Sequence, residues 1–165
     1  MASKVILTYP DERLKSYSTA VDKFDDGLQQ FIQELEQTRQ AGPSAVGIAA
    51  PQIGYFQRII TIDASQQKRK TENHGHLVLI NPEITHWEGL VSGREGCLSV
   101  PDYTGNVVRA ASIELTAFDP SGKPLHFSMN GFEARIVQHE MDHLDGLLFL
   151  DRLVSRRNDL FRRKV

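Results

Sequence analysis

The sequence contains a single cysteine, Cys97, among its 165 residues. A lone cysteine excludes an intramolecular disulfide, so we expect a reducing compartment, with the cytoplasm as the simplest assignment. Long apolar runs are also missing, because no segment approaches the ~20 residues that a membrane-spanning helix requires. The apolar stretch within residues 1–10 is too short for a signal peptide, and we expect a short strand there.

An excess of charge of either sign is absent too, because the formal net charge is -2. This balance gives no support for binding to nucleic acid or to an anionic membrane surface. Hydrophobic residues make up 40% of the chain and charged residues 24%, which is typical of a globular protein. No repeat, low-complexity tract or linker divides the sequence. We therefore expect one catalytic domain spanning residues 1–165.

Hydrophobic periodicity predicts an α+β fold with mostly antiparallel sheets packed around a central helix. An amphipathic helix is predicted over residues 26–40, and a loop or edge strand over the glycine-rich residues 45–54. The basic residues 151–165 are predicted to form a short surface helix. The predicted strands cover residues 58–63, 77–80, 84–91, 112–118 and 125–129.

The central helix is predicted to begin after Asn130 and to end at Asp145-Gly146. Asn130 is a favourable N-cap residue, and Glu133 has the spacing of a capping box. Apolar residues lie on more than one side of this segment, so we expect the helix to be buried.

The central helix carries the motif His139-Glu140-Met141-Asp142-His143. Histidines four residues apart project from one face of a helix and can bind a single metal ion. The glutamate between them suits a hydrolase in which it transfers protons for an activated water molecule. The motif is short enough to arise by chance, but two buried histidines need partners, and a metal ion supplies one.

Cys97 has three interpretations: a buried small hydrophobic residue, a third metal ligand, or a catalytic nucleophile with a histidine base. A structural zinc site would need four protein ligands. A catalytic site uses three and leaves one position for water, and Cys97, His139 and His143 meet that number.

Three separated segments resemble the signature motifs of the peptide deformylase family, in the family's order and approximate spacing. They are residues 45–52, 95–99 and 138–144. Residues 9–14 are also similar to the family's N-terminal segment, so the resemblance covers nearly the whole chain. It implies a metallohydrolase that removes the N-formyl group from formylmethionine at the start of newly made polypeptides and releases formate.

The resemblance also implies the roles of individual residues. Cys97, His139 and His143 would hold one divalent metal, usually Fe²⁺, although Zn²⁺, Ni²⁺ or Co²⁺ can occupy such a site. Glu140 would transfer protons during attack on the formyl carbon. The Gln52 amide and the Leu98 backbone N–H would stabilise the negative charge that develops on the formyl oxygen.

The substrate is expected to bind as an extended strand beside Gly47 and Ile48. Candidates for the methionine pocket are Val46, Phe132 and Ile136, although each is equally plausible as ordinary core. Expected partners are formylated nascent peptides at the ribosome, with the enzyme acting as a monomer. Charged residues expected near the ligands are Glu95, Arg109 and Asp142.

Some residues depart from the family pattern or stand outside it. Ala45 replaces a usual glycine, Gly93 stands where many members have an apolar pocket residue, and Thr104 stands where several have arginine. These departures concern substrate preference, so a specialised paralogue remains an alternative. His74 and His76 are expected to belong to a solvated loop rather than to a second metal site.

Two other functions are consistent with the residues alone. A different metallohydrolase, such as a peptidase, would cleave unformylated peptides. A non-catalytic binding module would retain the fold without turnover, although the intact Glu140 and Gln52 argue against it.

Overall fold

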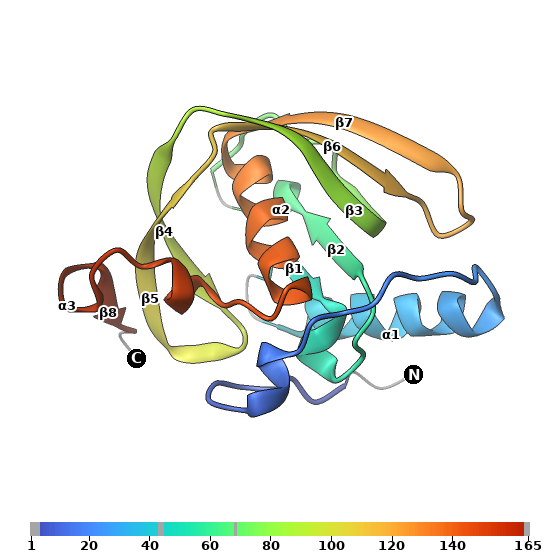
Figure 1. Ribbon diagram of the computed structural model, residues 1–165, viewed down its shortest axis with the longest axis horizontal. Helices are drawn as coiled ribbons and strands as arrows, with labels where there is room; N and C mark the ends of the chain where they lie inside the picture. The colour runs from blue at the N-terminus through green and yellow to red at the C-terminus, as the bar shows by residue number, and fades with distance from the viewer. Residues whose placement is uncertain (1–3, 43–44, 68, 164–165) are drawn as a thin grey trace.

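A computed structural model describes residues 4–42, 45–67 and 69–163 of the chain. The buried helix α2 (Gly131–Leu144) lies at the centre, between two antiparallel sheets (Figure 1). The five-stranded sheet has the order β1-β2-β3-β6-β7, and the three-stranded sheet has the order β4-β5-β8. The α+β prediction with a central helix is therefore confirmed.

The strands are β1 (Gly47–Ala49), β2 (Ile59–Asp63), β3 (His76–Glu88), β4 (Val91–Cys97), β5 (Val100–Arg109), β6 (Ser112–Phe118), β7 (Pro124–Asn130) and β8 (Leu160–Arg162). The other helices are α1 (Asp26–Ala41), α3 (Arg156–Asp159) and the 3-10 helices η1 (Glu12–Lys15), η2 (Ala50–Ile53), η3 (Ala64–Gln66) and η4 (Phe149–Arg152). No helix within the described ranges is long and apolar enough to cross a bilayer.

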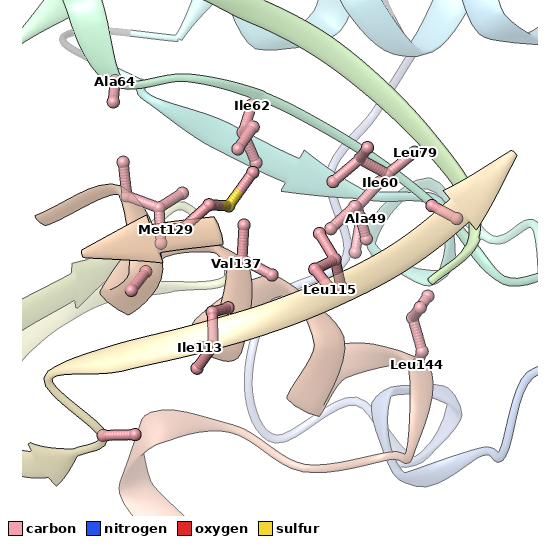
Figure 2. Packing of buried hydrophobic residues seen from close by; sticks show 14 residues of the cluster. Ala49, Ile60, Ile62, Ala64, Leu79, Ile113, Leu115, Met129, Val137 and Leu144 are labelled. Carbon is pink, nitrogen blue, oxygen red and sulfur yellow. The ribbon is translucent and has the colours of Figure 1, made fainter. Parts of the chain in front are cut away.

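The main core fills the space between the five-stranded sheet and α2. Val137 and Leu144 of α2 are fully buried against strand residues such as Ile60, Ile62 and Leu115 (Figure 2). This apolar contact fixes the helix against the sheet, because buried hydrocarbon of this kind contributes ~25 cal/mol per Å² removed from water. The histidines of α2 are thereby held on a rigid element.

Helix α1 covers the opposite face of the same sheet. The Asp25 side chain accepts a hydrogen bond from the Leu28 backbone N–H at 2.9 Å, which caps the helix. Leu28 and Leu35 pack with Ile59 of β2, whereas the neighbouring Ile60 faces α2. The predicted amphipathic helix is confirmed, and β2 is buried on both faces.

The expected break between residues 77–80 and 84–91 is wrong, because β3 runs continuously through Asn81-Pro82. The register of β3 on β6 shifts between Ile80 and Glu83, so a bulge accommodates the two residues. Asn81 has φ 51° and uses its side chain to bond Val21, accepting from its N–H and donating to its carbonyl. The Asn81-Pro82 turn signal therefore marks a bulge within β3 and not the end of a strand.

The three-stranded sheet was not predicted, although its strands provide one wall of the site. β4 and β5 form a hairpin, and β8 pairs with β5 through Tyr103↔Arg162 to Gly105↔Leu160. The predicted surface helix over residues 151–165 is wrong, because that segment contains η4, a single turn α3 and then β8. Residues 164–165 lie outside the described ranges.

The short strand expected within residues 1–10 is also wrong for the part of this segment that the structure describes. Residues 4–10 form no strand, although the Leu7 N–H bonds the Gln52 carbonyl and the Tyr9 N–H bonds the Ser99 carbonyl. Residues 1–3 of that expectation lie outside the described ranges. The predicted edge strand within residues 45–54 is present as β1, followed by η2.

Helix α2 begins after Asn130 as predicted, but the expected capping box does not form. The Asn130 side chain caps no helix N–H. The buried Glu133 carboxylate instead accepts hydrogen bonds from the backbone and ring of His74, at 2.7 and 2.6 Å. The Glu133 carboxylate is therefore used in a tertiary contact with His74 and not in a local capping box.

Candidate metal centre and active site

The structure brings Cys97, His139 and His143 together at the junction of β4 with α2. Their candidate ligand atoms all lie within 4.8 Å of one another, and His143 Nε2 is 3.4 Å from Cys97 Sγ. Among the described residues this is the only such group of at least three potential ligands. Helix spacing supplies the two histidines, and the tight turn between β4 and β5 supplies the thiol.

The donor set fits a divalent metal ion. His139 donates through Nδ1 to Glu95 at 2.8 Å, which leaves its Nε2 as the free ligand atom. Burial lowers the pKa of His143 well below its ordinary value, so this imidazole is held in the neutral form that can ligate. A thiolate with two imidazoles suits Fe²⁺, Zn²⁺, Ni²⁺ or Co²⁺.

A buried charge network supports the ligand His139 from behind. Arg109 donates two hydrogen bonds to Glu95, both at 2.9 Å, and a third to Asp142 at 2.6 Å. Arg152 of η4 also bonds Asp142. Burial alone would raise the pKa of Glu95, but hydrogen bonds from His139 and Arg109 hold it well below its usual range. Glu95 is therefore an anionic acceptor that fixes the ring of His139.

Glu140 lies beside the ligands with an unsatisfied oxygen. The residue is 4% exposed, and its Oε1 has no hydrogen-bond partner among the described residues. Oε1 is 4.0 Å from His143 Nε2, and burial raises the pKa of Glu140 to about 7. A Cβ atom at Gly47 would lie 2.8 Å from Glu140 Oε2, so β1 approaches the carboxylate closely. This carboxyl group is free to bind a water molecule or a substrate N–H.

The Gln52 side chain is fixed in orientation at the edge of the cluster. Its Oε1 accepts from the Ala49 backbone N–H at 2.9 Å. Its Nε2 donates to Ser99 Oγ at 2.9 Å and lies 3.6 Å from Cys97 Sγ. The amide donor therefore points toward the thiol. Leu98 lies between Cys97 and Ser99 at the same turn.

The candidate pocket residues have core contacts as well. Val46 and Phe132 are partly buried against the main core, and Ile136 is 4% exposed within it. Their role in a methionine pocket stays a prediction. Ile48 is fully buried beneath α1, on the opposite side of β1 from α2.

His74, which precedes β3, and His76, the first residue of β3, contact different acids. His74 bonds Glu133, whereas His76 Nε2 lies 2.7 Å from Glu36. They form no metal cluster with each other among the described residues. The contact of His74 with Glu133 ties the residues before β3 to the start of α2.

Three residues near the site were missed by the sequence reasoning: Ser99, Arg135 and Arg152. Ser99 is fully buried and binds Gln52. Arg135 bonds Glu95 at 2.6 Å. The signal for Arg135 was available, because it stands one helical turn before His139. No periodicity pointed to Ser99 or Arg152, which reach the site from a turn and from η4.

Comparison with known proteins gives consistent matches over nearly the whole chain. The family model described as Polypeptide deformylase matches residues 3–159. A peptide deformylase of Thermodesulfovibrio yellowstonii is 38% identical over 164 residues, covering 99% of this chain and 97% of that protein.

Solved structures agree with the sequence relatives. A peptide deformylase of Legionella pneumophila has a TM-score of 0.83 at 39% identity, covering 93% of this chain and 88% of that one. A Met-Ala-Ser-bound class I type b peptide deformylase of Acinetobacter baumannii has a TM-score of 0.85 at 31% identity, covering 92% and 99%.

Proposed function

Since the chain belongs to the polypeptide deformylase family, whose metal-dependent hydrolases remove the N-formyl group from nascent peptides, we propose that Cys97, His139 and His143 hold its metal ion. The proposal is supported by the meeting of a thiol and two imidazole nitrogens within 4.8 Å. We propose Fe²⁺ as the metal in the cell, with Zn²⁺, Ni²⁺ or Co²⁺ as substitutes. A bound divalent ion would supply Lewis-acid activation of water and of the formyl carbonyl.

Glu140 is proposed as the proton-transfer group, and its unpartnered buried oxygen is the observation that carries this assignment. The carboxylate takes a proton from the water that attacks the formyl carbon. It then delivers a proton to the amine that leaves as formate is released. A pKa raised by burial to about 7 suits both steps near neutral pH.

Gln52 and Leu98 are proposed to stabilise the charge on the formyl oxygen. The Gln52 amide is held from both ends, by the Ala49 N–H and by Ser99 Oγ, so little reorganisation accompanies the reaction. The Leu98 backbone N–H would add a second donor from the turn that carries Cys97. Loss of one such donor typically costs about 10²–10³ in rate.

The substrate is proposed to add to β1 as a further strand. β1 is the edge of its sheet and pairs only with β2 among the described strands, so its other edge is open to a peptide. Gly47 and Ile48 would provide the backbone contacts. Val46, Phe132 and Ile136 would contact the first side chain.

We further propose one catalytic domain over residues 1–165 that acts as a monomer on nascent chains at the ribosome. The cytoplasm is proposed as its location, because a ligand thiol at Cys97 must stay reduced.

The test is formate release by protein purified without oxygen, with metal content measured on the same sample. We expect one equivalent of divalent metal, hydrolysis of formyl-Met-Ala-Ser, and no cleavage of unformylated Met-Ala-Ser. Cleavage of the unformylated peptide would favour a peptidase. A metal-free, inactive protein would favour a binding module.

A further inference from the structure

Gly93 lies in the wall of the site, on the side of β4 that faces α2. It stands two residues before Glu95, and residues two apart in a strand face the same side. Glu95 accepts from His139 at 2.8 Å, which identifies that side. Because Gly93 has no side chain, it leaves space for a side chain from α2.

The guanidinium group of Arg135 fills this space. A Cβ atom at Gly93 would lie 2.9 Å from Arg135 Cζ, 3.0 Å from Nε and 3.1 Å from Nη2. Arg135 Nη1 donates to Glu95 at 2.6 Å and to the Val107 carbonyl at 3.0 Å, and Nη2 donates to the Val91 carbonyl at 2.7 Å. The group is therefore held flat against β4 and β5.

Helix geometry places Arg135 close to the face of α2 that carries the candidate ligand His139, one turn nearer the start of the helix. With ~3.6 residues per turn, Phe132 and His139 lie on one line along α2, with Arg135 on one side and Ile136 on the other. Ile136 faces β1, because its Cγ2 would lie 3.1 Å from a Cβ at Gly47. Ile136 therefore lies on the β1 side of this helix face, and the guanidinium group of Arg135 lies on the β4 side.

Part of the hydrogen-bonding capacity of Arg135 remains free. Of the five N–H donors of a guanidinium group, the Nε–H and one Nη2–H have no partner within the described part of the chain. The side chain as a whole is 12% exposed, so it is partly accessible to solvent. Its charge is already paired with Glu95, and a neutral acceptor therefore fits better than a second carboxylate.

We propose that Arg135 determines specificity by donating a hydrogen bond to the first side chain of the formylated peptide. This inference rests on the proposed deformylase function. The favoured class is N-formyl peptides whose first side chain has the length of methionine and carries a neutral oxygen acceptor, such as glutamine or methionine sulfoxide. Four residues, about 6 Å along the helix axis, separate His139 from Arg135, which a side chain of this length can span.

The test compares kcat/KM for formyl-Gln-Ala-Ser and formyl-norleucine-Ala-Ser, which differ in the acceptor. Arg135→Met should lower the glutamine-to-norleucine ratio about tenfold, since hydrogen bonds to a charged group are worth roughly one factor of ten or more. The matched control is Arg94→Met, the same substitution on the opposite, exposed face of β4, where Arg94 lies over Phe161. The ratio should not change in this control.

A second variant leaves Arg135 in the chain. Gly93→Ala places a Cβ 2.9 Å from the guanidinium carbon and displaces the group, so the ratio should fall in the same direction. An unchanged ratio in both variants would overturn the proposal, even if both rates fall together through the loss of the Glu95 contact. No formate from any formylated peptide with the wild-type protein would instead overturn the proposed function, and this inference with it.

Discussion

Glu95 is the residue on which the buried charges around the site converge. Its two oxygens accept from His139, Arg109 and Arg135, at distances between 2.6 and 2.9 Å. Two arginines more than offset one carboxylate, and Asp142 balances these buried charges by binding Arg109; it also pairs with the half-exposed Arg152. Removing a single member leaves an uncompensated buried charge, which costs about 3–5 kcal/mol. The network is therefore a unit that fixes the ring of His139.

Glu140→Gln tests the proton-transfer role while preserving the size of the side chain. We expect full metal content and a fall in kcat of about 10²–10⁴, because an amide cannot accept the proton. Metal analysis and formate release on the same sample measure both quantities. Loss of the metal in this variant would mean that Glu140 is a ligand.

At the scale of single residues the sequence predicted which candidate ligands meet, but not all of the side chains that surround them. Cys97, His139 and His143 were predicted from motif and resemblance, and the structure brings them together. Arg135 was missed although it stands one helical turn before His139, because an arginine in an apolar helix suggests a solvent-facing position. Its burial depends on Gly93, which is 42 residues earlier in the chain, and no local pattern connects the two.

Among the elements, β1 combines a structural and a proposed binding role. Gly47→Ala would place a Cβ 2.8 Å from Glu140 Oε2 and 3.1 Å from Ile136 Cγ2. We expect kcat/KM to fall by at least tenfold, with a loss of about 1–3 kcal/mol in the free energy of unfolding from overpacking. Formate release and urea unfolding measure the two effects.

The matched control for Gly47 is Gly27→Ala in the first turn of α1. A Cβ there meets only Asp25 Oδ1, at an ordinary 3.5 Å. Its activity should match the wild type, and its stability should rise by about 0.5–1 kcal/mol. Equal activity in the two variants would contradict the close approach of β1 to the site.

Asp63 is the last residue of β2 and the N-cap of η3, and its contribution to stability is expected to depend on pH. Burial would raise its pKa, but hydrogen bonds from the backbone N–H and hydroxyl of Ser65 lower it below the ordinary value. A lowered folded-state pKa stabilises the protein above the unfolded-state pKa, and this contribution is lost as the pH falls through the folded-state value. Asp63→Asn should therefore destabilise the protein by about 1 kcal/mol at pH 7.

The difference in unfolding free energy between Asp63→Asn and wild type should shrink between pH 7 and pH 3. Urea unfolding at both pH values measures it. The same difference in unfolding free energy at both pH values would show that the charge of Asp63 does not contribute to stability.

The elements that sequence patterns predicted are those stabilised locally. α1 has a side-chain cap and regular apolar spacing. β4 was missed because Gly93, Arg94 and Gly96 interrupt any apolar alternation, and the strand is held instead by its ladder with β5 and by contacts of Glu95. β8 was missed because its stability comes from pairing with β5, distant in the chain.

For the whole molecule, the proposed metal joins two sheets. Cys97 belongs to the three-stranded sheet, whereas His139 and His143 lie on a helix packed against the five-stranded sheet. A ligand that binds only the folded state at 100 times its Kd adds about 2.7 kcal/mol of stability. Removal of the metal by a chelator should therefore lower the Tm, and calorimetry before and after metal is restored measures the shift. An unchanged Tm would contradict a shared site.

The order of the site residues along the chain also has a consequence for how each molecule is made. Gln52 comes from η2 and Cys97 from β4, but His139 and His143 come from α2, which follows strands β1 to β7. Synthesis proceeds from the N-terminus, so the strands emerge before the helix that completes the site. With the proposed ligands, a nascent chain whose α2 has not yet emerged lacks both histidines and would be unable to hydrolyse a formyl group.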